Sequence, residues 1–177
     1  MPICSNARRY SAKIDLGLAS IGKNLNVWYY SFKLHVIIDD NMDIVSITFT
    51  NASTHDLSVL EGNFIKGIKG FLIGDKGYIG KQKTSDLLDK DIILITKPRK
   101  NMLKFPASSF QINLLKARQK IESVFSTLKY RLNLINRYTQ SIKSYFSNTL
   151  AAITIYIFSK GPLKLFQDLD FSKFLIS

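Results

Sequence analysis

Apolar and polar side chains alternate along residues 28–38, where the regular part of the chain opens. This period of two predicts a half-buried β-strand. The Asp- and Asn-rich residues 39–43 predict a turn, and the β-branched run at residues 44–50 predicts a second strand. We therefore expect a β-hairpin here. Residues 1–27, with scattered Gly and Asn, are expected to form an irregular arm.

A strand–helix–strand unit is predicted next, after a short helix at residues 56–65. Apolar residues 70–73 predict a buried strand, residues 83–90 a helix, and residues 92–96 a further strand. Two strands joined through a helix favour parallel pairing by a right-handed crossover. The sequence therefore predicts an α/β fold whose second sheet is locally parallel.

Two helices are predicted in the second half of the chain. Apolar side chains recur every three or four residues from Leu114 to Ile135, which indicates a long amphipathic helix. A last helix is predicted over residues 142–158, and its largely apolar second half is expected to be buried. No internal repeat or linker is visible in the sequence. We therefore expect one domain at residues 1–160, followed by a C-terminal tail at residues 161–177.

The charge of the chain is unevenly distributed. Lys and Arg number 25 against 13 Asp and Glu, a formal net charge of +12. Between Lys97 and Lys143 the only acidic residue is Glu122, so most of the excess lies in this segment. Such a basic block indicates a polyanionic partner, either nucleic acid or an anionic membrane surface. A highly soluble protein with a biased composition is the alternative, but concentration of the charge in one stretch argues against it.

Other sequence features bear on the compartment. The longest apolar run, near residues 150–158, is about half as long as a membrane-spanning helix. The N-terminal residues lack the charged start and apolar stretch of a secretory signal. Cys4 is the single cysteine, which excludes an internal disulfide and fits a reducing environment. We expect a soluble, cytoplasmic protein with no membrane partner.

Asp75 is a candidate metal ligand. Phosphodiester cleavage at neutral pH is served by two Mg²⁺ ions that a few carboxylates hold at the end of a sheet. Asp75 follows the apolar residues 71–73 and lies between Gly74 and Gly77, which allow close approach of a metal or DNA. An ordinary β-turn is an alternative interpretation. A dinucleotide-binding loop is disfavoured, because the spacing of Gly74, Gly77 and Gly80 differs from G-x-G-x-x-G.

Glu122 is the second candidate, on the predicted long helix. At 100° per residue, Arg118, Glu122 and Lys129 share one face of this helix. A carboxylate among cations stays ionised, as a metal ligand must. The alternative is a surface Arg–Glu pair that contributes only roughly a few tenths of a kcal/mol. Asp75, Glu122 and the basic block together indicate phosphoryl-transfer chemistry on a nucleic acid.

These residues resemble a known family, the DDE-type transposases of bacterial insertion sequences. The run at residues 74–78 resembles the second-aspartate motif of that family, and residues 30–35 and 54–56 are similar to segments between its first two aspartates. Three helix residues match the type and spacing of its Y-x2-R-x3-E-x6-K signature: Arg118, Glu122 and Lys129. Leu115 stands at the tyrosine position of the signature. The resemblance covers most of the chain, from residue 2 to residue 160.

The resemblance implies an RNase H-like α/β fold, a mixed sheet flanked by helices, with an Asp, Asp, Glu triad that binds Mg²⁺ or Mn²⁺. Asp75 and Glu122 would take the second and third places, as catalytic and metal-binding residues. The first aspartate of the family lies on the opening strand, just before a segment like Pro2 to Cys4. That strand and its aspartate are therefore expected to be missing from this chain, and catalysis to be severely reduced or absent.

The resemblance further implies DNA as the partner. An intact member hydrolyses the phosphodiester at the transposon end and uses the freed 3′-hydroxyl to attack target DNA. A homo-oligomer is expected when the protein is active, and a bacterial cytoplasmic location at the nucleoid. Contacts to DNA phosphates are expected from seven cations: Arg118, Lys129, Lys97, Arg99, Lys100, Arg8 and Arg9.

Two alternatives from other functional classes stay open. One is a non-catalytic DNA-binding remnant that binds transposon ends or inhibits an intact copy. The other is a basic RNA-binding protein, which is ranked lower because no aromatic-rich RNA-binding motif is visible. His35 and His55 do not have a recognisable metal-ligand spacing, so a structural role is expected for both.

Overall fold

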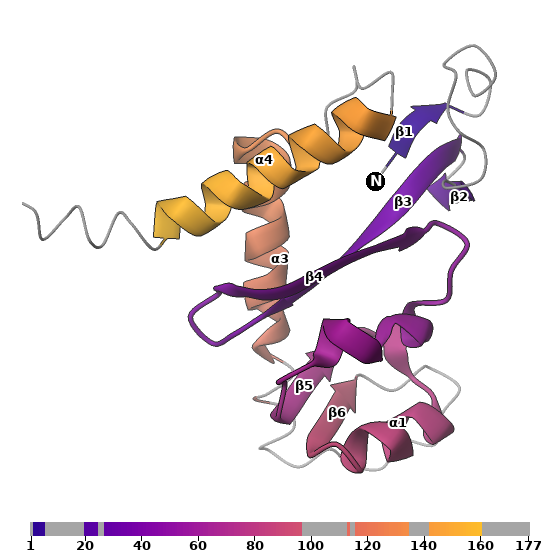
Figure 1. The fold of residues 1–177 in the computed structure, drawn as a ribbon, viewed down its shortest axis with the longest axis vertical. Coiled ribbons are helices and arrows are strands. Elements are labelled where there is room, and N and C mark those ends of the chain that lie inside the picture. The colour runs from indigo at the N-terminus through magenta and orange to yellow at the C-terminus, as the bar shows by residue number, and fades with distance from the viewer. Residues whose placement is uncertain are drawn as a thin grey trace, which may run out of the picture.

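The computed structural model describes residues 2–5, 20–24, 27–96, 113, 116–134 and 142–160. Its fold is a mixed α/β arrangement of two small sheets and helices, as expected, and is compatible with an RNase H-like fold (Figure 1). The strands are β1 (Pro2–Ser5), β2 (Ser20–Asn24), β3 (Val27–Ile38), β4 (Ile44–Asn51), β5 (Gly70–Gly74) and β6 (Ile92–Thr96). The helices are α1 (Lys81–Leu88), α3 (Arg118–Ser126) and α4 (Ile142–Lys160), with the short turns η2 (Asp56–Val59), η3 (Gly62–Ile65), η4 (Lys76–Tyr78) and η5 (Thr127–Arg131).

The predicted hairpin is confirmed. Strands β3 and β4 pair antiparallel, from Phe32 opposite Asn51 to Ile38 opposite Ile44. The expected irregular arm is wrong in part, because β1 and β2 also pair antiparallel with β3, over its residues 27–31. Neither short strand has the alternation that marks a strand in sequence. Both are stabilised by backbone bonds to an edge that only the folded β3 supplies.

The predicted strand–helix–strand unit is also confirmed. Strands β5 and β6 pair in parallel, from Gly70 opposite Ile92 to Gly74 opposite Thr96, with α1 between them in the chain. Leu87 of α1 and Ile92 of β6 are each only 1% exposed and join the core of this unit. The helix predicted at residues 56–65 forms as two 3₁₀ turns, η2 and η3.

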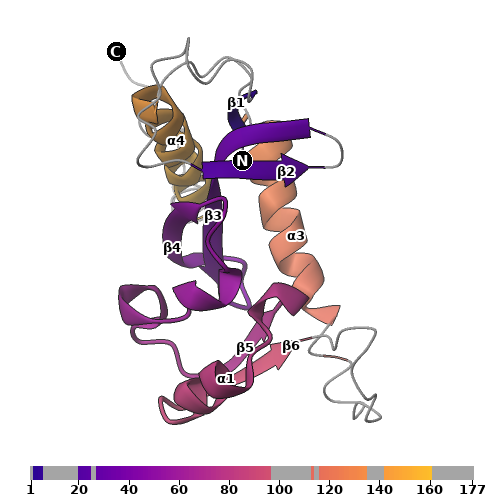
Figure 2. The same ribbon diagram turned by 90° about the vertical axis from the view of Figure 1, so that its right-hand side faces the viewer.

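The alternation of β3 gives the hairpin two buried faces. Leu34 and Ile38 pack against a core that α3, η5 and α4 supply, through residues such as Leu128 and Ile153. Ile37 packs on the other face, in the core formed by η2, η3, α1 and β6. Figure 1 shows the hairpin between α4 and the β5–β6 unit, and Figure 2 shows α3 running beside the hairpin down to that unit. The central strand therefore connects both halves of the fold.

The long helix predicted up to Ile135 ends earlier than expected. The long helix ends as the π-helical turn η5 at Arg131, short of the predicted Ile135. Asn133 adopts a left-handed conformation (φ 55°), and the Leu134 amide donates to the Leu128 carbonyl at 2.9 Å.

None of the described helices is long and apolar enough to cross a membrane.

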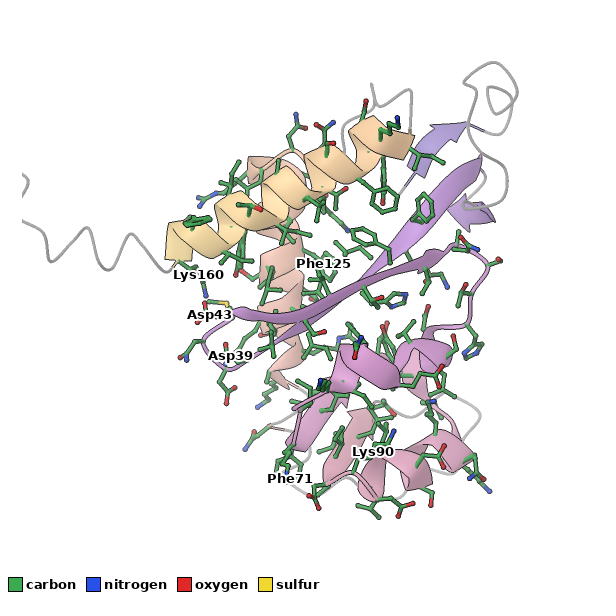
Figure 3. All side chains as sticks on the ribbon, viewed as in Figure 1. Asp39, Asp43, Phe71, Lys90, Phe125 and Lys160 are labelled. Atoms are coloured by element: carbon green, nitrogen blue, oxygen red, sulfur yellow. The ribbon has the colours of Figure 1, made fainter. Side chains whose placement is uncertain are left out.

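The second half of helix α4 is apolar in sequence, but only one of its sides is buried. Ala152, Ile153 and Tyr156 are buried, but Ile155 and Phe158 are 52% and 62% exposed. The prediction of a fully buried second half is therefore wrong, because only one side of a helix faces the hairpin. The end of α4 contacts the β3–β4 turn, where the Tyr156 hydroxyl donates to the Met42 carbonyl at 2.9 Å. Lys160 reaches the same turn and lies 3.9 Å from Asp43 (Figure 3).

Candidate active site

The turn that carries Asp75 is built by close packing. Strand β5 ends at Gly74, and the Tyr78 amide then donates to the Asp75 carbonyl at 3.0 Å, which closes η4. A Cβ at Gly74 would lie 3.3 Å from Tyr78 Cδ2, and a Cβ at Gly77 would lie 2.5 Å from Asp56 Oδ2. Any side chain at position 77 would therefore displace the Asp56 carboxylate from its present place. Asp75 itself has a 61% exposed side chain at the carboxyl end of a parallel strand.

Arg118 joins the two candidate carboxylates. Its Nη1 lies 3.0 Å from Asp75 Oδ1, and its Nη2 lies 2.9 Å from Glu122 Oε1. Asp75 comes from the turn after β5, whereas Arg118 and Glu122 lie one turn apart on α3. Figure 2 shows α3 running down beside β3 to the β5–β6 unit. The fold thus brings both predicted acids to one guanidinium group.

The electrostatics of this cluster favour the charged form of Arg118. The hydrogen bond to Glu122, and to a smaller extent the charge of Asp75, raise the pKa of Arg118 above its ordinary value. The side chains of both acids are 61% exposed, so water screens these ion pairs and their net contribution to stability is small, below about 1 kcal/mol each. Because these ion pairs contribute little to stability, Asp75, Arg118 and Glu122 can exchange each other for a bound ligand at low cost.

Two exposed carboxylates that converge on one cation also suit a divalent metal. Oxygen ligands of this kind are those that Mg²⁺ and Mn²⁺ prefer. Among the residues that the structure describes, no third His, Cys, Asp or Glu joins Asp75 and Glu122. The residues present therefore fit a metal, but supply only part of its protein ligands.

Two hollows adjoin the cluster. A cavity of about 230 Å³ is lined by Asp75, Glu122 and Arg118, and also by Tyr78 and His35. A larger groove of about 540 Å³ lies between β3 and β5, with α3 along it. Arg118 lines both, so the candidate site opens on one side into the space between the two sheets.

Comparison with known protein families decides the family. The family model described as "Transposase DDE domain" matches residues 1–140, well over half of the chain. The chain belongs to the DDE transposase family. No curated protein and no solved structure matches the chain. DNA is accordingly the partner that the family implies, and DDE transposases generally work with divalent metal ions.

The other expected DNA contacts of this DDE transposase are described only in part. Lys129 lies in η5, with its Nζ 5.6 Å from the centroid of the Phe125 ring, and Phe125 lines the same cavity as Glu122. Lys129 thus lies near the cluster without joining it through a described ion pair. The remaining predicted contacts lie outside the described residues: Arg8, Arg9, Lys97, Arg99 and Lys100.

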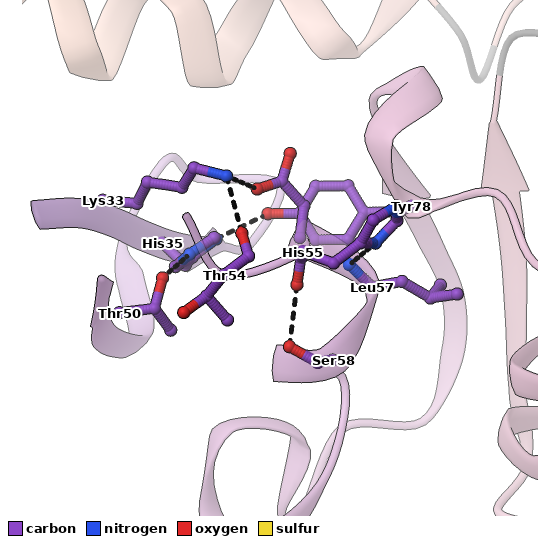
Figure 4. A network of polar contacts seen from close by, with 9 residues as sticks. Lys33, His35, Thr50, Thr54, His55, Leu57, Ser58 and Tyr78 are labelled. Atoms are coloured by element: carbon purple, nitrogen blue, oxygen red, sulfur yellow. Dashed lines mark hydrogen bonds and ion pairs between the residues drawn. The ribbon is translucent and has the colours of Figure 1, made fainter. Parts of the chain in front are cut away.

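A polar network beside the site was missed by the sequence interpretation (Figure 4). His35 is 5% exposed, and its ring nitrogens lie 2.9 Å from the Tyr78 hydroxyl and 2.8 Å from Thr50 Oγ1. Lys33 donates to Asp56 Oδ1 at 2.8 Å. One pattern in the sequence pointed to this network. Lys33 and His35 are polar residues two apart on a strand with both faces covered, so they share one face and need polar partners there.

The other histidine has a local role. The amide of Leu57 donates to His55 Nδ1 at 3.2 Å, which caps η2. This is the structural role expected for His55, and it lies outside the cluster of Asp75 and Glu122.

Proposed function

We propose that residues 1–160 form the catalytic domain of an insertion-sequence transposase of the YREK-signature group. In this proposal Asp75 and Glu122 bind a divalent cation, Mg²⁺ or Mn²⁺, at the scissile phosphodiester. The observation that carries the proposal is the bridge through Arg118, which joins an acid 43 residues away in sequence to the acid on its own helix. Both carboxylates are exposed, so a metal ion can reach them from solvent.

Each side chain would have a separate role at the phosphodiester. The bound metal would activate the attacking water or 3′-hydroxyl and neutralise developing charge. Asp75 and Glu122 would hold it, and both would then give up their bonds to Arg118. The released guanidinium has the planar donor geometry that suits a phosphate. Lys129, two turns further along the same helical face, would contact a flanking phosphate.

We also propose double-stranded DNA, at the transposon ends and at the target, as the substrate. The net charge of +12 supports a polyanionic partner. An active form would be a homo-oligomer working at the nucleoid of a bacterial cytoplasm. Membership of the family and the positive charge support DNA as the partner.

The groove between the two sheets would accommodate a further strand. Residues 32–38 of β3 pair with β4 alone, and β5 pairs with β6 alone, among the strands that the structure describes. An extended segment in the groove would have a strand edge on each side and would join both sheets into one. We propose that a strand carrying a further metal-binding aspartate belongs in this groove.

Reading the DNA upstream of the Met1 codon in frame tests this last point. The supporting result is an open frame that encodes an apolar strand with an Asp just before Pro2. That strand would fill the groove between β3 and β5, and an active enzyme would be expected. A stop codon or frameshift would leave DNA binding as the expected activity of this polypeptide.

The metal site is tested by Mn²⁺ binding, followed by electron paramagnetic resonance, and by nicking of supercoiled plasmid. Asp75→Asn and Glu122→Gln should each abolish binding, and any nicking, while the exposed acid control Asp89→Asn should behave as wild type. Mn²⁺ binding that survives both site substitutions would refute the assignment. Salt-sensitive DNA binding that persists in all variants without nicking would instead match the non-catalytic alternative.

A further inference from the structure

Two polar struts connect β3 to the turn that presents Asp75 (Figure 4). The first runs from His35 to the Tyr78 hydroxyl, at 2.9 Å, and is completed by Thr50 on the other ring nitrogen at 2.8 Å. Tyr78 is the residue whose amide closes the turn on the Asp75 carbonyl. The first strut therefore locates the end of the turn relative to the hairpin.

The second strut begins two residues earlier on the same face of β3. Lys33 donates to Asp56 Oδ1 at 2.8 Å and to the Thr54 carbonyl at 2.7 Å. The Asp56 carboxylate in turn packs against Gly77, where even one Cβ would approach Oδ2 to 2.5 Å. Both struts thus end on adjacent residues of the turn, Gly77 and Tyr78.

The ionisation of these groups suits a fixed arrangement. Burial lowers the pKa of His35, against the charge of Asp56, so the imidazole is neutral at neutral pH and offers one donor and one acceptor. Burial also raises the pKa of Tyr78 to about 12, so the phenol keeps its proton. Tyr78 and Thr50 carry hydroxyl groups that can each donate or accept, so every polar atom of the first strut has a partner.

From this geometry we infer that His35 and Tyr78, with the Lys33–Asp56 pair, are positioning residues that fix Asp75 opposite Glu122. Asp75 projects from an exposed turn, whereas Glu122 projects from a helix packed on the other face of β3. The hairpin is the common reference for both. A metal held by two such carboxylates needs their separation fixed closely, and partners behind the ligands supply this. The inference rests on the proposed function, because it assigns Asp75 as a metal ligand.

The test compares two Tyr→Phe substitutions. Tyr78→Phe removes the hydroxyl that His35 binds, and Tyr156→Phe removes a hydroxyl that donates to Met42 in the β3–β4 turn, outside the Asp75 turn, at the same distance of 2.9 Å. Both variants should lose similar stability in thermal unfolding. Mn²⁺ affinity should fall about 10-fold or more in Tyr78→Phe and stay unchanged in Tyr156→Phe. Amide hydrogen exchange at Tyr78 should speed up in Tyr78→Phe alone.

The possible outcomes separate the two hypotheses. Wild-type affinity and wild-type exchange in Tyr78→Phe would overturn the positioning role, and the proposed function would stand if Asp75→Asn still abolishes Mn²⁺ binding. Mn²⁺ binding that Asp75→Asn leaves intact would overturn the proposed function itself. His35→Gln provides a second probe, since an amide can keep one of the two bonds. It should retain more Mn²⁺ affinity than His35→Ala, and equal losses in the two variants would contradict positioning by hydrogen bonding.

Discussion

Gly77→Ala is the substitution whose effect follows most directly from the packing of the Asp75 turn. Gly77 does not have a positive φ, so the backbone can accept alanine. The new Cβ would lie 2.5 Å from Asp56 Oδ2 and 3.4 Å from Asp56 Cγ. The carboxylate must then move by roughly 1 Å to reach a normal van der Waals separation. A shift of that size strains its 2.8 Å bond to Lys33.

The expected cost is about 2 kcal/mol, within the range for overpacking. Lower entropy of the unfolded chain offsets about 0.4–1 kcal/mol of this, as for any Gly→Ala change. For a chain of this length, about 1–2 kcal/mol lowers the melting temperature by roughly 2–8 °C. Thermal unfolding followed by circular dichroism measures the shift.

Asp56→Ala provides the matched background, because it removes the carboxylate atoms that the new methyl group would meet. Gly77→Ala should then cost little or become slightly stabilising, giving a coupling energy of about 1–2 kcal/mol between positions 56 and 77. Equal effects of Gly77→Ala in both backgrounds would refute the packing argument. A neutral Gly77→Ala in the wild-type background would refute it as well.

Three further predictions address the site, the pH dependence and the core. Arg118→Met should tighten Mn²⁺ binding, because the competing guanidinium is gone, while stability changes by less than about 1 kcal/mol; weaker Mn²⁺ binding in titration would contradict the competition. The pKa of His35 is lowered from 6.5 in the folded state, so the unfolded chain gains the proton first and stability should fall as pH drops below that value. Urea unfolding from pH 8 to 5 should show a shallower decline in His35→Gln, and identical slopes would count against this. Leu128→Ala, at a side chain that is 0% exposed, should cost about 2–5 kcal/mol, against under about 1 kcal/mol for Leu88→Ala at 60% exposure; equal losses in urea unfolding would contradict the assigned core.

Local patterns predicted most of the regular elements. The alternation before residue 39 and the β-branched run after residue 43 correctly predicted the β3–β4 hairpin, and the βαβ unit through residues 70–96 formed in parallel as expected. These predictions succeeded because hydrophobic periodicity reports which face of a local backbone must be buried. The short strands β1 and β2 were missed, since two strands of four and five residues depend on the partner edge rather than on their own sequence.

The sequence by itself determined the residue types of the site and the charge that goes with a polyanionic partner. Motif spacing singled out Asp75, Arg118 and Glu122, although the elements that carry them are remote in the chain. Only the tertiary structure decided that Arg118 bridges the two acids, at 3.0 and 2.9 Å. It also decided that His35 contacts the Tyr78 hydroxyl at the end of the Asp75 turn, and that one side of the apolar α4 stays exposed. The physical reason is that contacts between distant elements depend on how whole faces pack, which no local period records.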